Sequence, residues 1–220
     1  MAKSKTSETK LTESRRLMVK ALEEFGIVDQ EILSAFERVP RHRFLPDVMH
    51  AMAYEIAPLV LAEDLIVPSP TVAASALDAL KIGSGSRVLE VGTGTGYLTA
   101  LLAELSASVY TVEVDVEREE TARKLLGTLG YRNVFCRSGC GLSGWQARGP
   151  FDAIMVNVAL EQLPRDLLSQ LTPEGRLVFP IKEEFISAVL VERHEGEFIT
   201  TDLGPAQFPM ARVQKLDDLN

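Results

Sequence analysis

The sequence is poor in cysteine, histidine and tryptophan, and it contains no long apolar run. Its two cysteines, Cys136 and Cys140, lack the spacing of a metal or redox motif, and its three histidines are scattered along the chain. No apolar stretch approaches the length of a membrane span, and the first ten residues are too polar for a signal peptide. We therefore expect a cytoplasmic protein with reduced thiols, without a metal site and without membrane contact.

Positive charge is scarce beyond the first 20 residues. The formal net charge is −8, yet residues 1–20 hold six lysines or arginines against two glutamates, which leaves −12 on the remainder. A face that binds nucleic acid needs basic residues, so the acidic body argues against a nucleic-acid partner. We expect residues 1–10 to form a disordered tail and residues 11–220 a single domain.

One stretch combines a strand pattern with three alternating glycines. Arg87–Val91 has the apolar character of a buried parallel strand, and a helical pattern begins at Tyr97. Gly92, Gly94 and Gly96 carry no β-carbon, so the turn between strand and helix can take positive φ angles and lie against a ligand. In an open α/β sheet, such a turn predicts a nucleotide-type cofactor at the carboxyl end of the strand.

The segments around this turn alternate between strand and helix patterns, which predicts an α/β fold. Residues 11–80 carry helical patterns with the N-cap candidates Thr12, Asp29 and Ser69, and form a helical N-terminal cap. Residues 81–220 form a Rossmann-like core whose mostly parallel sheet ends in an antiparallel hairpin. The expected strands are Arg87–Val91, Ser108–Val114, Val134–Arg137, Phe151–Val156, Arg176–Ile181, Ser187–Arg193 and Phe198–Leu203. The expected helices between them are Tyr97–Leu105, Val116–Leu129 and residues 164–171.

The glycine pattern distinguishes two classes of cofactor. A nicotinamide or flavin site requires Gly-x-Gly-x-x-Gly, and Tyr97 stands where the third glycine belongs. The alternating form suits S-adenosyl-L-methionine, which has no pyrophosphate. Glu113 and Val114 follow at the end of the next strand, where a carboxylate can accept hydrogen bonds from both ribose hydroxyls. The cofactor contacts expected in the first turn are Glu90, Gly92, Thr93, Gly94 and Gly96.

Several segments resemble the protein-L-isoaspartate O-methyltransferase family, from about residue 14 to about residue 210. They are Val39–Arg41, Val88–Tyr97, Val109–Glu113, Gly144–Arg148 and Pro150–Val156. The resemblance implies methyl transfer from S-adenosyl-L-methionine to the stray carboxylate of isoaspartyl residues, and thereby protein repair. It also implies a protein or peptide substrate and an N-terminal extension that covers the cofactor.

The segment Ala62–Pro70, which aligns with the family's reactive loop, departs from the family sequence. Where the family has a serine implicated in catalysis, this chain has Pro68, which has neither a hydroxyl nor a backbone N–H. Ser69, one residue later, is a catalytic candidate, although a role as helix N-cap suits it better. Val67 and Pro68 are expected to contact substrate. Glu63 and Asp64 add two negative charges, which would disfavour an anionic acceptor if both faced the site.

Other departures lie farther along the chain. Cys140, followed by Gly141, stands where the family's aspartate holds the adenine amino group, so we expect a weaker cofactor contact there. Asn157 stands where the family commonly has threonine, near the expected position of the methyl group, and is a second catalytic candidate. Residues 204–209 resemble the segment that lies behind the substrate in the family. Within it, Gln207, next to Phe208, replaces the family's basic residue.

These departures leave three hypotheses open. The first is isoaspartyl methyl transfer. The second is a methyltransferase on the same scaffold that acts on a neutral or cationic acceptor, such as a small molecule, which Gln207 and the acidic loop would suit. The third is an interaction protein that binds the cofactor weakly or not at all, because Pro68 and Cys140 have replaced two working residues.

Overall fold

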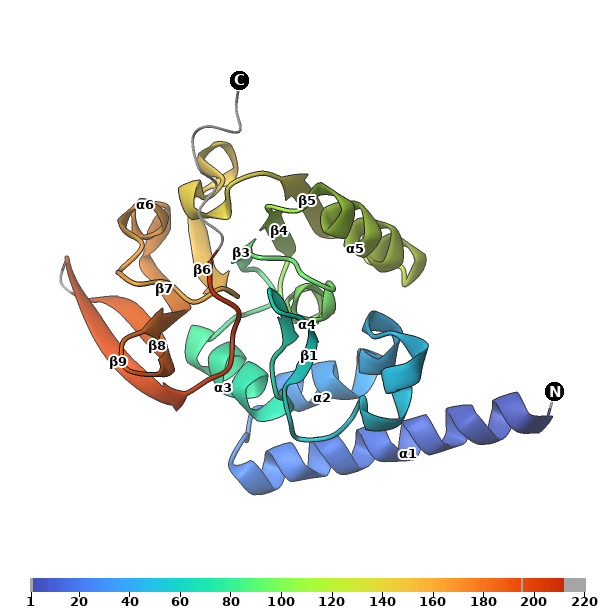
Figure 1. Ribbon diagram of the computed structural model, residues 1–220. Helices are drawn as coiled ribbons and strands as arrows, with labels where there is room; N and C mark the ends of the chain where they lie inside the picture. Colours follow the sequence, from blue (N-terminus) through green and yellow to red (C-terminus); the bar gives the residue numbers. More distant parts are fainter. Residues whose placement is uncertain (1, 195, 212–220) are drawn as a thin grey trace.

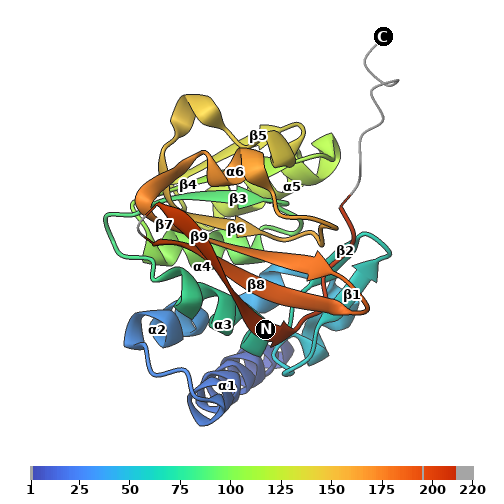
Figure 2. The same ribbon diagram turned by 90° about the vertical axis from the view of Figure 1, so that its left-hand side faces the viewer.

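The computed structural model describes residues 2–194 and 196–211, and a twisted mixed sheet forms its centre (Figures 1 and 2). Its strands are β3 (Arg87–Val91), β4 (Ser108–Glu113), β5 (Val134–Ser138), β6 (Phe151–Val156), β7 (Leu171–Lys182), β8 (Ile186–His194) and β9 (Glu197–Pro205). They lie in the order β5-β4-β3-β6-β7-β8-β9. The first five of these positions are parallel, and β8 and β9 are antiparallel. The predicted α/β class, with a parallel sheet that ends in an antiparallel hairpin, is confirmed.

Side chains of the central strand alternate between two apolar cores, one on each face of the sheet. Val88 packs in the core that contains α2 (Gln30–Arg38), α3 (Pro70–Leu80) and α4 (Tyr97–Leu105). Its neighbour Leu89 belongs to the other core, with α6 (Arg165–Leu168). Successive strand residues point to opposite faces, so burial of both faces explains the nearly continuous apolar sequence of β3. A polar site on this strand therefore has to open at its end.

Helix α1 (Ala2–Phe25) begins earlier than the sequence predicted. It continues back to Ala2, through residues that we expected to form a tail, and no glycine or proline interrupts it. Thr12 is consequently inside the helix and is not its N-cap: its hydroxyl donates to the carbonyl of Glu8. Phe25, the last residue of the helix, is 59% exposed. Among the described residues, none of the helices combines the length and the apolar character needed to cross a bilayer.

The other two predicted N-caps are confirmed. The Asp29 carboxylate accepts the N–H of Glu31 and Ile32 at the start of α2, and Ser69 Oγ accepts the N–H of Val72 at the start of α3. Between these helices lie the 3-10 segments η1 (Arg41–Phe44) and η2 (Asp47–Met52) and the hairpin of β1 (Leu59–Ala62) and β2 (Leu65–Val67). This hairpin lies next to the glycine turn and completes the cap over the sheet edge.

One boundary in the second half of the chain is wrong by several residues. The helix expected over residues 164–171 is the single turn α6, and β7 begins at Leu171 and not at Arg176. Leu171 lies opposite Phe151, and the register then shifts so that Arg176 lies opposite Ala153. Pairing with β6 thus extends the strand beyond what its apolar pattern indicated.

Candidate active site

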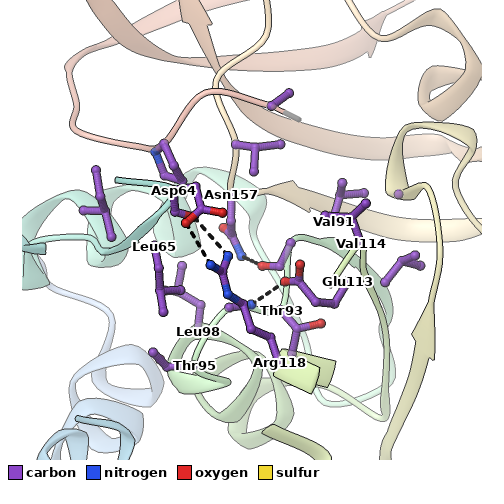
Figure 3. A pocket seen from close by; sticks show the side chains of 18 of the residues that line it. Asp64, Leu65, Val91, Thr93, Thr95, Leu98, Glu113, Val114, Arg118 and Asn157 are labelled. Carbon is purple, nitrogen blue, oxygen red and sulfur yellow. Dashed lines mark hydrogen bonds and ion pairs between the residues drawn. The ribbon is translucent and has the colours of Figure 1, made fainter. Parts of the chain in front are cut away.

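A pocket of about 910 Å³, including open solvent at its mouth, lies at the carboxyl ends of β3, β4 and β6 (Figure 3). The glycine turn forms one wall, and the loop after β5 forms another. The β1–β2 hairpin of the N-terminal cap and residues 209–211 form further walls. The place, at the point where the chain order of the sheet reverses, is typical of small-molecule sites in open α/β folds.

The glycine turn has a backbone that other residues would strain. The φ angles of Gly92, Gly94 and Gly96 are 89°, 53° and 86°, in the region that L side chains rarely adopt. A β-carbon on Gly94 would lie 3.3 Å from Leu65 Cδ1, so the hairpin packs directly on the turn. Gly96 lies outside the pocket and leaves room for Leu126 instead. The first two glycines thus border the pocket, and the third shapes the entry into α4.

Glu113, at the end of β4, lies on the pocket wall and is 5% exposed. Its Oε2 accepts the N–H of Gly94 at 2.8 Å, and its Oε1 accepts the N–H of Asp115 at 3.1 Å. A carboxylate has about four lone-pair sites, so two remain for a ligand. Glu113 therefore joins the glycine turn to the start of α5 (Val116–Thr128) while keeping acceptors for a diol. Val114 lines the pocket beside it.

Glu90 was expected to contact the cofactor, but it is completely buried and does not line the pocket. Its Oε2 accepts the hydroxyls of Thr99 and Thr111 at 2.6 and 2.7 Å, and its Oε1 accepts Asn157 Nδ2 at 2.9 Å. Thr93, which does line the pocket, bonds to Thr111 through its hydroxyl at 2.6 Å. Glu90 is therefore the centre of a buried network beneath the turn, and it positions residues that reach the pocket.

Replacement of Glu90 by glutamine should remove a pH dependence of stability. Burial raises the pKa of Glu90 from 4.5 to about 7. The folded protein then binds more protons than the unfolded chain between these two values, so the free energy of unfolding falls as pH rises through this window. Between about pH 5 and about pH 8, wild type should lose about 2–3 kcal/mol relative to Glu90→Gln.

Urea unfolding across this pH range measures the effect. Glutamine fits the network, because its amide nitrogen can donate to the two threonine hydroxyls while its oxygen accepts from Asn157. Parallel pH profiles for the two proteins would show that Glu90 titrates as an ordinary carboxyl, and so would contradict its burial as the cause.

The loop after β5 contributes Cys140 and Gly141 to the pocket. A β-carbon on Gly141 would lie only 2.5 Å from Val91 Cγ1, so a larger residue fits here only if the Val91 side chain moves. Cys140, which precedes it, lines the pocket and is exposed, with a free thiol. A thiol is a weak hydrogen-bonding group, so the Cys140 side chain is a poor acceptor for a base.

The Cys140→Asp variant should bind S-adenosyl-L-homocysteine about tenfold or more tightly than wild type. A carboxylate at this position supplies a charged acceptor for the adenine amino group, worth about 1.5–3 kcal/mol. Titration calorimetry measures the change, and Cys140→Ser, which has a small neutral side chain, is the matched control. Equal affinities for the aspartate and serine variants would mean that the adenine does not lie beside this residue.

The reactive loop places Val67 and Pro68 on the pocket wall and Ser69 outside it. Ser69 Oγ accepts the N–H of Val72 and bonds to the hydroxyl of Thr71. Its side chain is thus engaged as the cap of α3 and does not face the pocket, which argues against the catalytic role considered for it. The carbonyl of Pro68 accepts from the buried guanidinium of Arg41 at 3.0 Å, so the loop backbone is fixed.

The acidic pair of the hairpin divides between the pocket and solvent. Glu63 is exposed and does not line the pocket, whereas Asp64 does. Asp64 Oδ1 forms an ion pair with Arg118 of α5 at 2.8 Å, and both side chains are about four-fifths buried (Figure 3). Arg118 also donates to the carbonyl of Asp64. The charge of Asp64 is therefore offset by Arg118, whose Nε also lies 3.7 Å from Asp115 Oδ2.

The remaining predicted residues lie at different distances from the pocket. Asn157 lines it, next to Gly92, whereas Gln207 is exposed outside it and Phe208 is buried in the core. Sequence reasoning missed Arg118 and, of the segment 209–211, included only Pro209, as the end of the segment expected behind the substrate. Residues 209–211 reach the pocket because Pro209 and Ala211 pair with the backbone of Ala159, a contact between distant segments that no local pattern reveals.

Comparison with known proteins gives a consistent family. The family model described as protein-L-isoaspartate(D-aspartate) O-methyltransferase matches residues 13–213. The protein-L-isoaspartate O-methyltransferase of Gloeobacter violaceus is 40% identical over 190 residues, which cover 85% of this chain and 93% of that protein. Protein-L-isoaspartate O-methyltransferase 2 of Syntrophobacter fumaroxidans is 42% identical over 184 residues, 82% of this chain and 74% of that protein.

Solved structures show the same fold. A protein-L-isoaspartate O-methyltransferase superposes with a TM-score of 0.82 at 27% identity, over 90% of this chain and 66% of that chain. A Plasmodium falciparum protein assigned to the same activity, solved in complex with S-adenosyl-L-homocysteine, gives a TM-score of 0.76 at 21% identity. It covers 90% of this chain and 98% of its own, and at this identity it supports the fold alone.

Proposed function

Because this chain belongs to the protein-L-isoaspartate(D-aspartate) O-methyltransferase family, we propose that it methylates the free carboxylate of isoaspartyl residues in proteins or peptides. The product would be a methyl ester, the first step in repair of the damaged residue. The observation that supports this most is the pocket itself, which joins the glycine turn and the Glu113 carboxylate at one sheet edge.

The residues present fit S-adenosyl-L-methionine, which when bound supplies an electrophilic methyl group on a sulfonium. Glu113 keeps two acceptor sites for the ribose hydroxyls, since its other two accept Gly94 and Asp115. Gly92 and Gly94 let the backbone approach a ligand closely. The hydroxyl of Thr93 is hydrogen-bonded to that of Thr111, which fixes this part of the pocket wall.

The residues of this chain position the two reactants, and the reaction requires no proton transfer. The attacking carboxylate oxygen forms a bond to the methyl carbon while the carbon–sulfur bond breaks, which leaves a neutral ester and a neutral thioether. A carboxylate with a pKa of about 4 is ionised at neutral pH and needs no general base. Alignment of the two reactants is then the main source of rate, so Pro68 in place of a serine slows the reaction less than loss of the pocket would.

The charges of the acidic loop are compatible with an anionic acceptor. Asp64 is paired with Arg118, and Glu63 points outside the pocket. The acidic loop therefore does not favour a cationic acceptor as strongly as its sequence suggested. The two free cysteines fit a reducing compartment, and on this basis we also propose a cytoplasmic location.

A pair of peptides tests the proposal. One contains an isoaspartyl residue and the other its normal aspartyl twin, and each is incubated with the full chain and methyl-labelled S-adenosyl-L-methionine. We expect base-labile methyl ester on the isoaspartyl peptide and little on its twin. Equal labelling, or none while the cofactor binds, would overturn the proposal and direct the search to neutral or cationic acceptors.

A further inference from the structure

The amide of Asn157 is fixed in one orientation. The residue follows β6 and lines the pocket beside Gly92 (Figure 3). Its Nδ2 donates to Glu90 Oε1 and to the carbonyl oxygen of Gly92, both at 2.9 Å. A backbone carbonyl can only accept a hydrogen bond, so the amide nitrogen must face Gly92 whatever the protonation of Glu90. The oxygen, Oδ1, is therefore the end that is left.

Asn157 Oδ1 is buried and has no hydrogen-bond partner among the described residues. A buried acceptor without a donor is unfavourable, and such a group in a native site calls for an explanation. Donation from Nδ2 to the Glu90 carboxylate polarises the amide and strengthens Oδ1 as an acceptor. A ligand with a hydrogen-bond donor near Gly92 would satisfy this atom.

The strand order indicates which donor lies there. The pocket receives Cys140 and Gly141 after β5, Glu113 from β4, the glycine turn after β3 and Asn157 after β6. If the ribose lies on Glu113, the base and the methionine chain extend from it in opposite directions along the sheet edge. With the base beside Cys140, as the family resemblance implies, the methionine chain extends toward β6, two strand spacings or about 10 Å from β4.

The methionine chain has one donor group, its α-ammonium, whereas its own carboxylate and a carboxylate methyl acceptor have none. We propose that Asn157 Oδ1 accepts a hydrogen bond from the α-ammonium group of S-adenosyl-L-methionine. Asn157 is then a cofactor-positioning residue that sets the direction of the methyl group through the opposite end of the methionine chain. This inference rests on the proposed function and assigns one contact within it.

The test compares S-adenosyl-L-homocysteine with its des-amino analogue, in which hydrogen replaces the α-ammonium group, for wild type and Asn157→Leu. Titration calorimetry gives the ratio of the two dissociation constants within each protein, so a partly misfolded fraction cancels. Wild type should prefer the amino ligand, and the leucine variant should lose about tenfold or more of that preference. Asn157→Ala repeats the comparison in case the leucine variant does not fold.

Two outcomes would overturn the contact. Equal weakening of both ligands would mean that Asn157 acts only through the turn, and unchanged binding of both, with a raised KM for the peptide, would mean that it faces the acceptor. Each of these is distinct from failure of the proposed function, which would appear as absent ligand binding by wild type or absent ester formation.

Discussion

The Glu113→Ala variant should bind S-adenosyl-L-homocysteine at least about 100-fold more weakly than wild type. Two hydrogen bonds from ribose hydroxyls to a carboxylate are worth about 1.5–3 kcal/mol each, and every 1.4 kcal/mol is about tenfold in affinity. The substitution also frees the N–H groups of Gly94 and Asp115, which Glu113 now holds. The turn would therefore lose order at the same time as the ligand loses its acceptor.

Glu113→Gln separates these two contributions. Its amide oxygen can still accept one backbone N–H, while its nitrogen cannot accept from the ribose, so we expect an intermediate affinity. Titration calorimetry with S-adenosyl-L-homocysteine measures both variants. Glu117→Gln, on the neighbouring helix and outside the pocket, is the matched control and should bind as wild type does. An alanine variant with wild-type affinity would show that the ribose does not lie on Glu113.

The Arg41→Ala variant should lose about 3 kcal/mol or more of its free energy of unfolding. Arg41 is fully buried, and its guanidinium donates to the carbonyls of Ala53, Glu55, Ala57 and Pro68 at 3.0 to 3.4 Å. Burial lowers the pKa of Arg41 below its usual value. Alanine would leave these carbonyls without their donor, and buried acceptors without partners are costly.

The same variant should weaken cofactor binding, although Arg41 lies outside the pocket. The guanidinium joins the segment before β1 to Pro68, which lines the pocket after β2. Lysine keeps the charge but has no planar fork of five donors, so Arg41→Lys should recover only part of the stability. The exposed neighbour Arg43 provides the control, and Arg43→Ala should unfold as wild type does in urea. Equal stability of Arg41→Ala and Arg43→Ala would contradict the role of the buried guanidinium.

Those parts of the site that lie at strand ends could be predicted from the sequence. The glycine turn and Glu113 follow directly from the ends of two strands whose apolar pattern is clear, and parallel strands bring such ends to one edge. The contact expected between Glu90 and the cofactor was wrong, and the reason can be read from the sequence. Strand residues alternate between faces, so Glu90 shares the face of Val88 and points into the helical core, not toward the pocket.

Other contacts depend on the path of the chain and carry no local signal. Asp64 and Arg118 are 54 positions apart, and their ion pair exists because the β1–β2 hairpin folds over the start of α5. Both charges can be read from the sequence, but their pairing cannot. The sequence alone therefore overstated how strongly the acidic loop would repel an anionic acceptor. Ser69 illustrates the opposite case, since Ser followed by Pro predicts an N-cap from local geometry alone.

The central claim is that this sheet edge binds S-adenosyl-L-methionine despite Pro68 and Cys140. Titration calorimetry of the full chain with S-adenosyl-L-homocysteine, checked by equilibrium dialysis, tests it most directly. The geometry of Glu113 and the glycine turn predicts one site per chain with saturable binding below millimolar ligand, lost in Glu113→Ala. No binding at millimolar ligand by either method would contradict the claim and leave an interaction protein built on a methyltransferase fold.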